Sequence, residues 1–166
     1  MLVVRLTKVF MTAALAAFAV IVAYDNVIDY GSNYAFVQHV LSMDTTFPGN
    51  ALMHRAILDE NMWRNGYAVL IGGEALTAAL FIIGALLMLF SLNAPSRFSR
   101  AKVWVVAGTG VGFAIWFFGF MVVGGEYFAM WQSKAWNGQE AAFRFYMTMM
   151  AVAIFVSMGE DEFTGR

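Results

Sequence analysis

One acidic residue lies inside a long apolar stretch of the sequence, where a charge is costly. Glu74 is the only charged residue between Arg64 and Arg97. A carboxylate within a membrane costs about 3 kcal/mol to insert, so it usually faces the interior of a helical bundle and finds a partner there. Glu74 could therefore bind a proton, a cation or a small ligand. It could equally tie helices together through hydrogen bonds, as polar side chains in membranes often do.

Other ionisable residues are expected at the same end of the bundle as Glu74. Asp25 and Asp29 are four positions apart, so they share one face of a helix. Glu126 closes a later apolar segment, and Arg144 lies in the first turn of the next one. These residues are candidate ligand-binding residues. The alternative is that they are solvated helix ends, where charge is tolerated.

His39 and Asp44, in the connection above these helix ends, complete the candidate set. His39 and His54 are fifteen positions apart, without the short spacing of metal ligands, so no metal site is predicted. Ser42 is close to both candidates in sequence, but a catalytic triad is defined by geometry. No catalytic residue is therefore predicted, and the sequence gives no support for an enzyme.

The composition indicates that these residues lie in or near a membrane. The chain has 166 residues, of which 61% are hydrophobic and 13% are charged, whereas an ordinary soluble domain has about 25% charged residues. A formal net charge of -1 gives no reason to expect a nucleic-acid partner. There is no cysteine, which excludes iron–sulfur clusters and thiolate metal sites, and no apolar span contains the histidine that a membrane haem needs. No cofactor is predicted, and the expected partner is the lipid bilayer.

Four apolar segments are long enough to cross that bilayer, which takes about 20 residues per helix. The sequence predicts an all-α integral membrane four-helix bundle, forming a single domain over residues 1–166, with spans at about 6–28, 67–92, 103–125 and 141–157. Gly108 and Gly112 have the spacing that lets membrane helices approach closely. Trp116 lies in mid-span, where we expect it to be buried between helices.

The connection between the first two spans is expected to be partly helical. The segment Asp44-Thr-Thr-Phe-Pro48-Gly49 has the residues of a turn. Residues 50–65 mix apolar and charged side chains in a pattern typical of an amphipathic helix lying on the membrane surface.

Basic residues near the span ends predict the orientation. Arg5 and Lys8 precede the first span, and Arg97, Arg100 and Lys102 lie between the second and third. By the positive-inside rule, both termini and this middle connection face the cytoplasm. The candidate acidic residues then gather at the outer mouth of the bundle, and the cytoplasmic halves are expected to be nearly all apolar.

Two segments resemble a known family. Asn33-Tyr-Ala-Phe-Val-Gln-His-Val-Leu-Ser-Met-Asp-Thr-Thr-Phe-Pro48 and Gly125-Glu-Tyr-Phe-Ala-Met-Trp-Gln-Ser-Lys-Ala-Trp-Asn-Gly-Gln139 resemble the signatures of the bacterial "predicted small integral membrane protein" family, domain-of-unknown-function family 2165. The resemblance covers nearly the whole chain. It implies a four-helix protein of the bacterial inner membrane and supplies no activity or catalytic residues.

Three functions remain open from the sequence. The leading one is an accessory or assembly subunit of a larger membrane complex, because the chain is small, has no identifiable catalytic set and has a long aromatic outer connection. A homo-oligomer is the other possible assembly. The alternative is a carrier or sensor that binds a cation, a proton or a small ligand at the acidic outer mouth. A third, an enzyme of quinone or lipid chemistry, would have a pocket that the sequence does not reveal.

Overall fold

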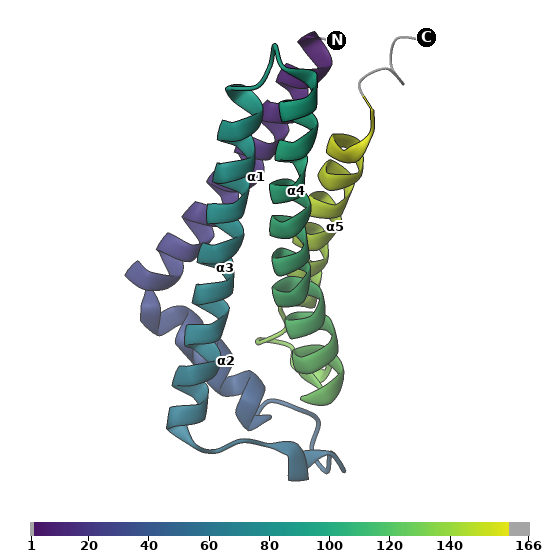
Figure 1. Ribbon diagram of the computed structural model, residues 1–166. Coiled ribbons are helices and arrows are strands. Elements are labelled where there is room, and N and C mark those ends of the chain that lie inside the picture. The colour runs from purple at the N-terminus through teal and green to yellow at the C-terminus, as the bar shows by residue number, and fades with distance from the viewer. Residues whose placement is uncertain (1, 160–166) are drawn as a thin grey trace.

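Four long helices form the molecule, and residues 2–159 are described by the computed structural model (Figure 1). Within these residues every regular element is helical. The long helices are α1 (Leu2–Ile28), α3 (Glu60–Leu89), α4 (Pro95–Phe113) with its π-helical continuation η2 (Ala114–Tyr127), and α5 (Gln139–Ser157). Each is long and apolar enough to cross a membrane. This confirms the predicted all-α bundle with four candidate membrane-spanning helices.

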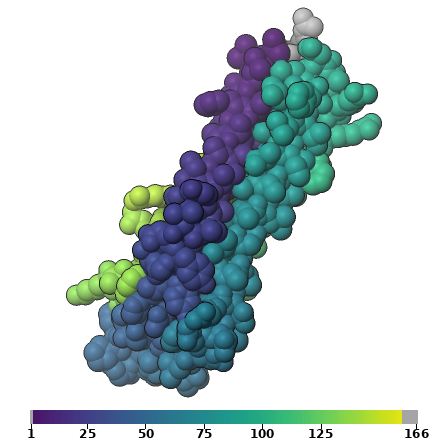
Figure 2. All heavy atoms as spheres, turned by 90° about the vertical axis from the view of Figure 1, so that its left-hand side faces the viewer, coloured from purple at the N-terminus to yellow at the C-terminus, as the bar shows by residue number. Residues whose placement is uncertain are grey.

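The two ends of the bundle differ in what they carry. Both ends of the described chain, together with the connection 90–94, lie at one end, which we call the termini end (Figure 1). The opposite end, which we call the loop end, holds residues 29–59 and 128–138. These include α2 (Tyr30–Ser42) and two short 3-10 turns, η1 (Met53–Arg55) and η3 (Met130–Gln132). In Figure 2, α1 (purple), α2 (blue) and α3 (teal) run along one face of the molecule.

Small residues on α4 allow the helices to approach closely. A Cβ atom added at Gly108 would lie 2.9 Å from the Phe81 ring of α3, and one at Gly112 would lie 2.6 Å from the sulfur of Met149 in α5. The predicted packing role of these glycines is therefore confirmed. Trp116 is buried in the main core, as expected.

The connection between α1 and α3 is helical in a different place from the one predicted. Its helix is α2, in which Val37 and Val40 are buried. Asp44–Gly49 forms turns as expected, and Gly49 has a φ of 76°, which favours glycine. The prediction of an amphipathic helix over residues 50–65 is wrong, because only η1 and the first turns of α3 are helical there.

Asp59 explains why that helix does not form. Asp59 is the N-cap of α3, with φ −84° and ψ 118°, and its side chain accepts a hydrogen bond from the backbone N–H of Asn61 at 2.8 Å. An N-cap residue has an extended backbone, so a helix does not continue through it. The same cap starts α3 at Glu60, seven residues before the expected position. Before it, the backbone is held by a bond from the N–H of Ile57 to the carbonyl oxygen of Leu41, at 2.8 Å.

The termini end contains three buried basic side chains, although the sequence predicted nearly apolar helix halves there. Arg5, Lys8 and Lys102 are all buried. Arg5 donates to the carbonyl oxygen of Leu92 at 2.6 Å, and Lys102 donates to that of Met158 at 2.9 Å. Lys8 also donates to Met158. The three cations therefore connect α1 and α4 to the chain beyond α3 and α5.

Candidate functional site

Glu74 lies halfway along the 30 residues of α3 and faces the bundle interior. Its carboxylate oxygen Oε2 accepts a hydrogen bond from the side-chain amide of Asn26 in α1, at 2.6 Å. Asn26 in turn accepts from Tyr67 of α3, whose hydroxyl lies 2.8 Å from the Asn26 carbonyl oxygen. Glu74, Asn26 and Tyr67 are 2%, 6% and 0% exposed. They form a buried polar chain between two helices.

Local structure explains why these three residues meet. Asn26 lies in the last turn of α1, where backbone carbonyl groups have no partner within the helix. The Tyr67 hydroxyl satisfies one of them. Tyr67 and Glu74 are seven positions apart on α3, so both side chains lie on the same face of that helix. Tyr30 of α2 packs edge-on against the Tyr67 ring, with centroids 4.7 Å apart, and fixes its position.

Glu74 also lines a cavity of about 360 Å³. Within residues 2–159 no donor contacts its second carboxylate oxygen, Oε1, and this oxygen is not sealed inside the protein. It is therefore available to a group in the cavity. The other polar lining residues are Asp25, Asn26, Asn33 and Tyr67, and the aromatic ones are Phe36, Trp116, Phe120 and Phe145. No basic side chain lines the cavity.

The structure brings together only part of the predicted acidic set. Asp25 lines the cavity with Glu74, whereas Asp29 is exposed and does not. Glu126 is also exposed and lies outside it. Arg144 is exposed, pairs with Glu140 one turn before it on α5, and lines a different cavity between α1 and α5.

His39 and Asp44 form a separate pair at the loop end. The Nδ1 atom of His39 lies 2.8 Å from a carboxylate oxygen of Asp44, and the imidazole stacks on Trp136 with centroids 4.5 Å apart. The stack on Trp136 joins the end of α2 to the connection before α5. Among the described residues no group of three or more His, Cys, Asp or Glu side chains is arranged to hold a metal ion.

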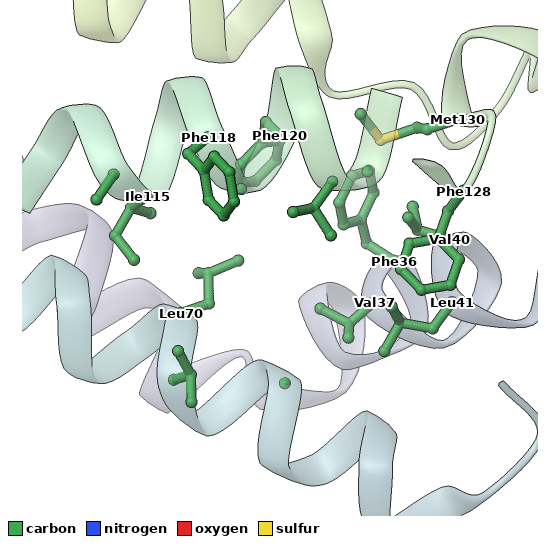
Figure 3. A pocket seen from close by; sticks show the side chains of 16 residues that line it. Phe36, Val37, Val40, Leu41, Leu70, Ile115, Phe118, Phe120, Phe128 and Met130 are labelled. Carbon is green, nitrogen blue, oxygen red and sulfur yellow. The ribbon is translucent and has the colours of Figure 1, made fainter. Parts of the chain in front are cut away.

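A second cavity, of about 370 Å³, adjoins the first and is lined by apolar side chains. Figure 3 shows its walls: Ile115, Phe118 and Phe120 come from η2, Leu70 from α3, and Phe36, Val37, Val40 and Leu41 from α2. Four residues line both cavities, namely Phe36, Val37, Leu70 and Phe120. The polar and the apolar cavity therefore share a wall.

The π-helix η2 forms part of both cavities. The N–H of Phe128 bonds the carbonyl oxygen of Val123, five residues earlier, at 3.0 Å, which is the π-helical pattern. Trp116 faces the polar cavity, and Phe118 faces the apolar one. π-helical turns are rare and are found frequently at functional sites. The sequence of this segment is apolar as far as Gly125 and gives no signal for the change of helix type.

Sequence reasoning missed Asn26 and Tyr67 as members of the site. Asn26 is an uncharged residue next to Asp25, and nothing in the local sequence sets it apart. The seven-residue spacing between Tyr67 and Glu74 was a usable signal, since it places both on one helix face. Asn26 meets Tyr67 and Glu74 through a tertiary contact between α1 and α3, which the local sequence does not reveal.

The two loop-end segments that carry the family resemblance pack against each other. The side-chain oxygen of Gln132 accepts from the backbone N–H of Phe47 at 3.0 Å, and the Thr45 hydroxyl donates to that of Ser133 at 2.9 Å. The Phe47 and Trp131 rings form an edge-to-face pair 5.8 Å apart. The two segments therefore form one structural unit above the cavities.

This fold and this site define a class: an integral membrane protein of four helices with a buried carboxylate at a cavity near one end. The model of the family described as "predicted small integral membrane protein (DUF2165)" matches residues 4–159, so the chain belongs to that family. Comparison with curated proteins and with solved structures finds no match.

Proposed function

We propose that the protein binds a small ligand bearing a cationic or hydrogen-bond-donating group, with Glu74 as its main contact. The observation that supports this proposal is that Glu74 lines a cavity and that no donor among the described residues bonds its Oε1 atom. A buried carboxylate that served only to join helices would be expected to direct both oxygens to protein donors. Cavities of 300 to 1,000 Å³, approximately, with a few converging polar groups are typical ligand sites.

The other lining residues favour a cation. Asp25, which is exposed, adds a second carboxyl group at the cavity, and none of the basic side chains of residues 2–159 lines it. Trp116, Phe120 and Phe145 provide aromatic walls, and ring faces attract cations. Asn26 and Asn33 supply amide groups that would orient the ligand. An amine satisfies all of these contacts.

The orientation is part of the proposal. The basic residues at the termini end favour a position in which that end faces the cytoplasm and the loop end faces outward. We place the protein in the bacterial inner membrane, with the chain forming one domain. The candidate site then opens toward the outer half of the bilayer.

A pair of variants tests the binding role of Glu74. Glu74→Gln keeps an acceptor for Asn26 and removes the negative charge, whereas Asp29→Asn removes an exposed carboxylate that lies outside the cavity. Each variant is extracted gently from its own membranes and examined by native mass spectrometry for a small retained molecule. We expect the wild type and Asp29→Asn to carry it and Glu74→Gln to lack it. Equal retention by all three would refute the proposal.

A second candidate, an accessory subunit of a larger complex, is favoured by one observation at the loop end. Phe47 and Trp131 form an edge-to-face aromatic pair, and each of the two residues is about half exposed. Aromatic side chains are enriched at protein interfaces. If this pair binds a partner, Trp131→Glu will remove a stoichiometric protein from preparations in mild detergent. Recovery of only the free protein from wild-type membranes would contradict this candidate.

A further inference from the structure

We infer that the ligand is an amphiphile from the bilayer, with its polar group against Glu74 and its tail in the adjoining apolar cavity. This inference rests on the function proposed above and names the class of its ligand. The proposed function concerns the polar cavity alone, whereas this inference places one ligand in both cavities.

The apolar cavity is suited to a hydrocarbon chain. All sixteen lining residues are apolar, and in Figure 3 their side chains contain only carbon apart from the sulfur of Met130. A cavity of about 370 Å³ lined by apolar side chains offers little to hold water molecules, which need two or more polar partners. An apolar occupant is therefore favoured over water.

The two cavities are close enough for one molecule to occupy both. The wall between them includes Phe36 of α2 and Phe120 of η2, whose rings stack with centroids 5.8 Å apart. Val37 and Leu70 complete the shared wall. Because these are side chains with rotatable bonds, a tail can pass between them after rotamer changes alone.

The route of entry is from the lipid. Val69 and Phe118 line the apolar cavity and are 69% and 57% exposed. Both lie in candidate membrane spans, so their exposed surfaces face hydrocarbon. A tail can thus enter sideways from the bilayer. The head that fits the neighbouring cavity is an amine, because a phosphate would meet Glu74 and Asp25 with no basic residue to receive it.

Cavity-filling variants separate the tail from the head. A Cβ atom at Gly66 would point toward the side chains of Leu41 and Val37, at 3.4 and 3.7 Å, which both line the apolar cavity. Gly66→Leu therefore fills that cavity. Gly119→Leu is an independent second variant, since a Cβ there meets nothing closer than 3.7 Å. Gly72→Leu is the control, because Gly72 is exposed, lines neither cavity and has open space around it.

The experiment titrates the solubilised protein with dodecylamine and with butylamine and reads occupancy by native mass spectrometry. The variants are compared with one another for the same amine. The fraction of that amine taken up by detergent micelles is then the same for every variant. We expect both filling variants to bind dodecylamine about tenfold more weakly, as the loss of about two buried methylene groups would give. Butylamine binding and the Gly72→Leu control should stay at the wild-type level.

Each remaining outcome has a distinct meaning. If Glu74→Gln weakens both amines and the filling variants leave dodecylamine unchanged, the tail site is refuted and the proposed function stands. If the filling variants weaken butylamine equally, they act through the polar cavity, and the tail site is again refuted. If Glu74→Gln changes neither amine, the proposed function fails and the inference fails with it.

Discussion

Buried charge is used differently at the two ends of the molecule. At the termini end, Arg5, Lys8 and Lys102 donate hydrogen bonds to the backbone carbonyl groups of Leu92 and Met158. These carbonyl groups belong to chain segments just beyond α3 and α5. Toward the loop end, in the middle of α3, the buried charge-bearing group is Glu74, which accepts one side-chain hydrogen bond on Oε2 and lines a cavity.

The difference indicates two roles for costly residues in a membrane protein. A cation that donates to the end of a neighbouring helix replaces the partner that this helix end lacks, so it contributes to the fold. A carboxylate that leaves an oxygen facing a cavity gains less stability from its burial. We conclude that substitutions of the buried cations at the termini end should change stability, and that substitutions of Glu74 should chiefly change binding.

The largest effect is expected from removing both lysines at the termini end. Lys8 and Lys102 donate to the same carbonyl oxygen of Met158, so either one can satisfy it alone. We expect the double variant Lys8→Met/Lys102→Met to cost about 1 kcal/mol or more beyond the sum of the two single variants, because only the double variant leaves that carbonyl without a lysine donor. Denaturant unfolding of all four proteins measures this coupling. Strict additivity would contradict the shared acceptor, and a change in amine binding would contradict the separation of the two ends.

A smaller effect is expected where Asn26 meets Glu74. Asn26→Leu removes the donor to Oε2 and should destabilise the protein by about 1 to 2 kcal/mol. Adding Glu74→Leu should recover most of this loss, since replacing both partners by apolar groups is nearly neutral. The double variant should nevertheless fail to bind butylamine. Wild-type binding by this variant would show that the pair is purely structural.

The His39–Asp44 pair should contribute less again. Its two side chains are 29% and 47% exposed, and pairs of this kind contribute about 0 to 1 kcal/mol. Asp44→Asn should therefore lower the free energy of unfolding by about 0.5 kcal/mol or less and leave butylamine binding unchanged. A large loss of binding would mean that the loop end acts directly on the cavity. Titration of Asp44→Asn and of the wild type with butylamine, side by side, measures whether binding changes.

The smallest effect is expected at Arg144, the one basic member of the predicted site. It pairs with Glu140 on the exposed face of α5, and such pairs contribute roughly 0.3 to 0.5 kcal/mol. Arg144→Gln should change neither stability nor binding by more than this. Reduced amine binding by Arg144→Gln would show that Arg144 takes part in the binding site after all.

Much of this fold could be predicted because membrane spans have a simple apolar signal, but only part of the candidate site could. The four helices follow from hydropathy, and Glu74 stands out because it interrupts one of them. Helix α2 was missed although Phe36, Val37 and Val40 have helical spacing, because the segment is short and close to the end of α1. The N-cap at Asp59 was present in the sequence and would have placed the start of α3 correctly.

The remaining parts of the site depend on contacts between distant segments. Asn26 and Glu74 are 48 positions apart, and nothing local to either residue predicts that they meet. The cavity walls require the positions of α2 and η2, and apolar sequence alone does not define those positions. Burial of Lys8 was equally hidden, because a basic residue near a span end normally reaches the interface.

The most direct test of this account measures the unfolding free energy and the butylamine dissociation constant of Glu74→Gln on the same preparation. Because glutamine still offers an oxygen to Asn26, we predict a change in unfolding free energy below about 1 kcal/mol. We also predict binding weakened about tenfold or more, the loss expected when the charge-assisted contact is removed. A destabilised protein with wild-type binding would contradict the account and leave Glu74 as a structural link between α1 and α3.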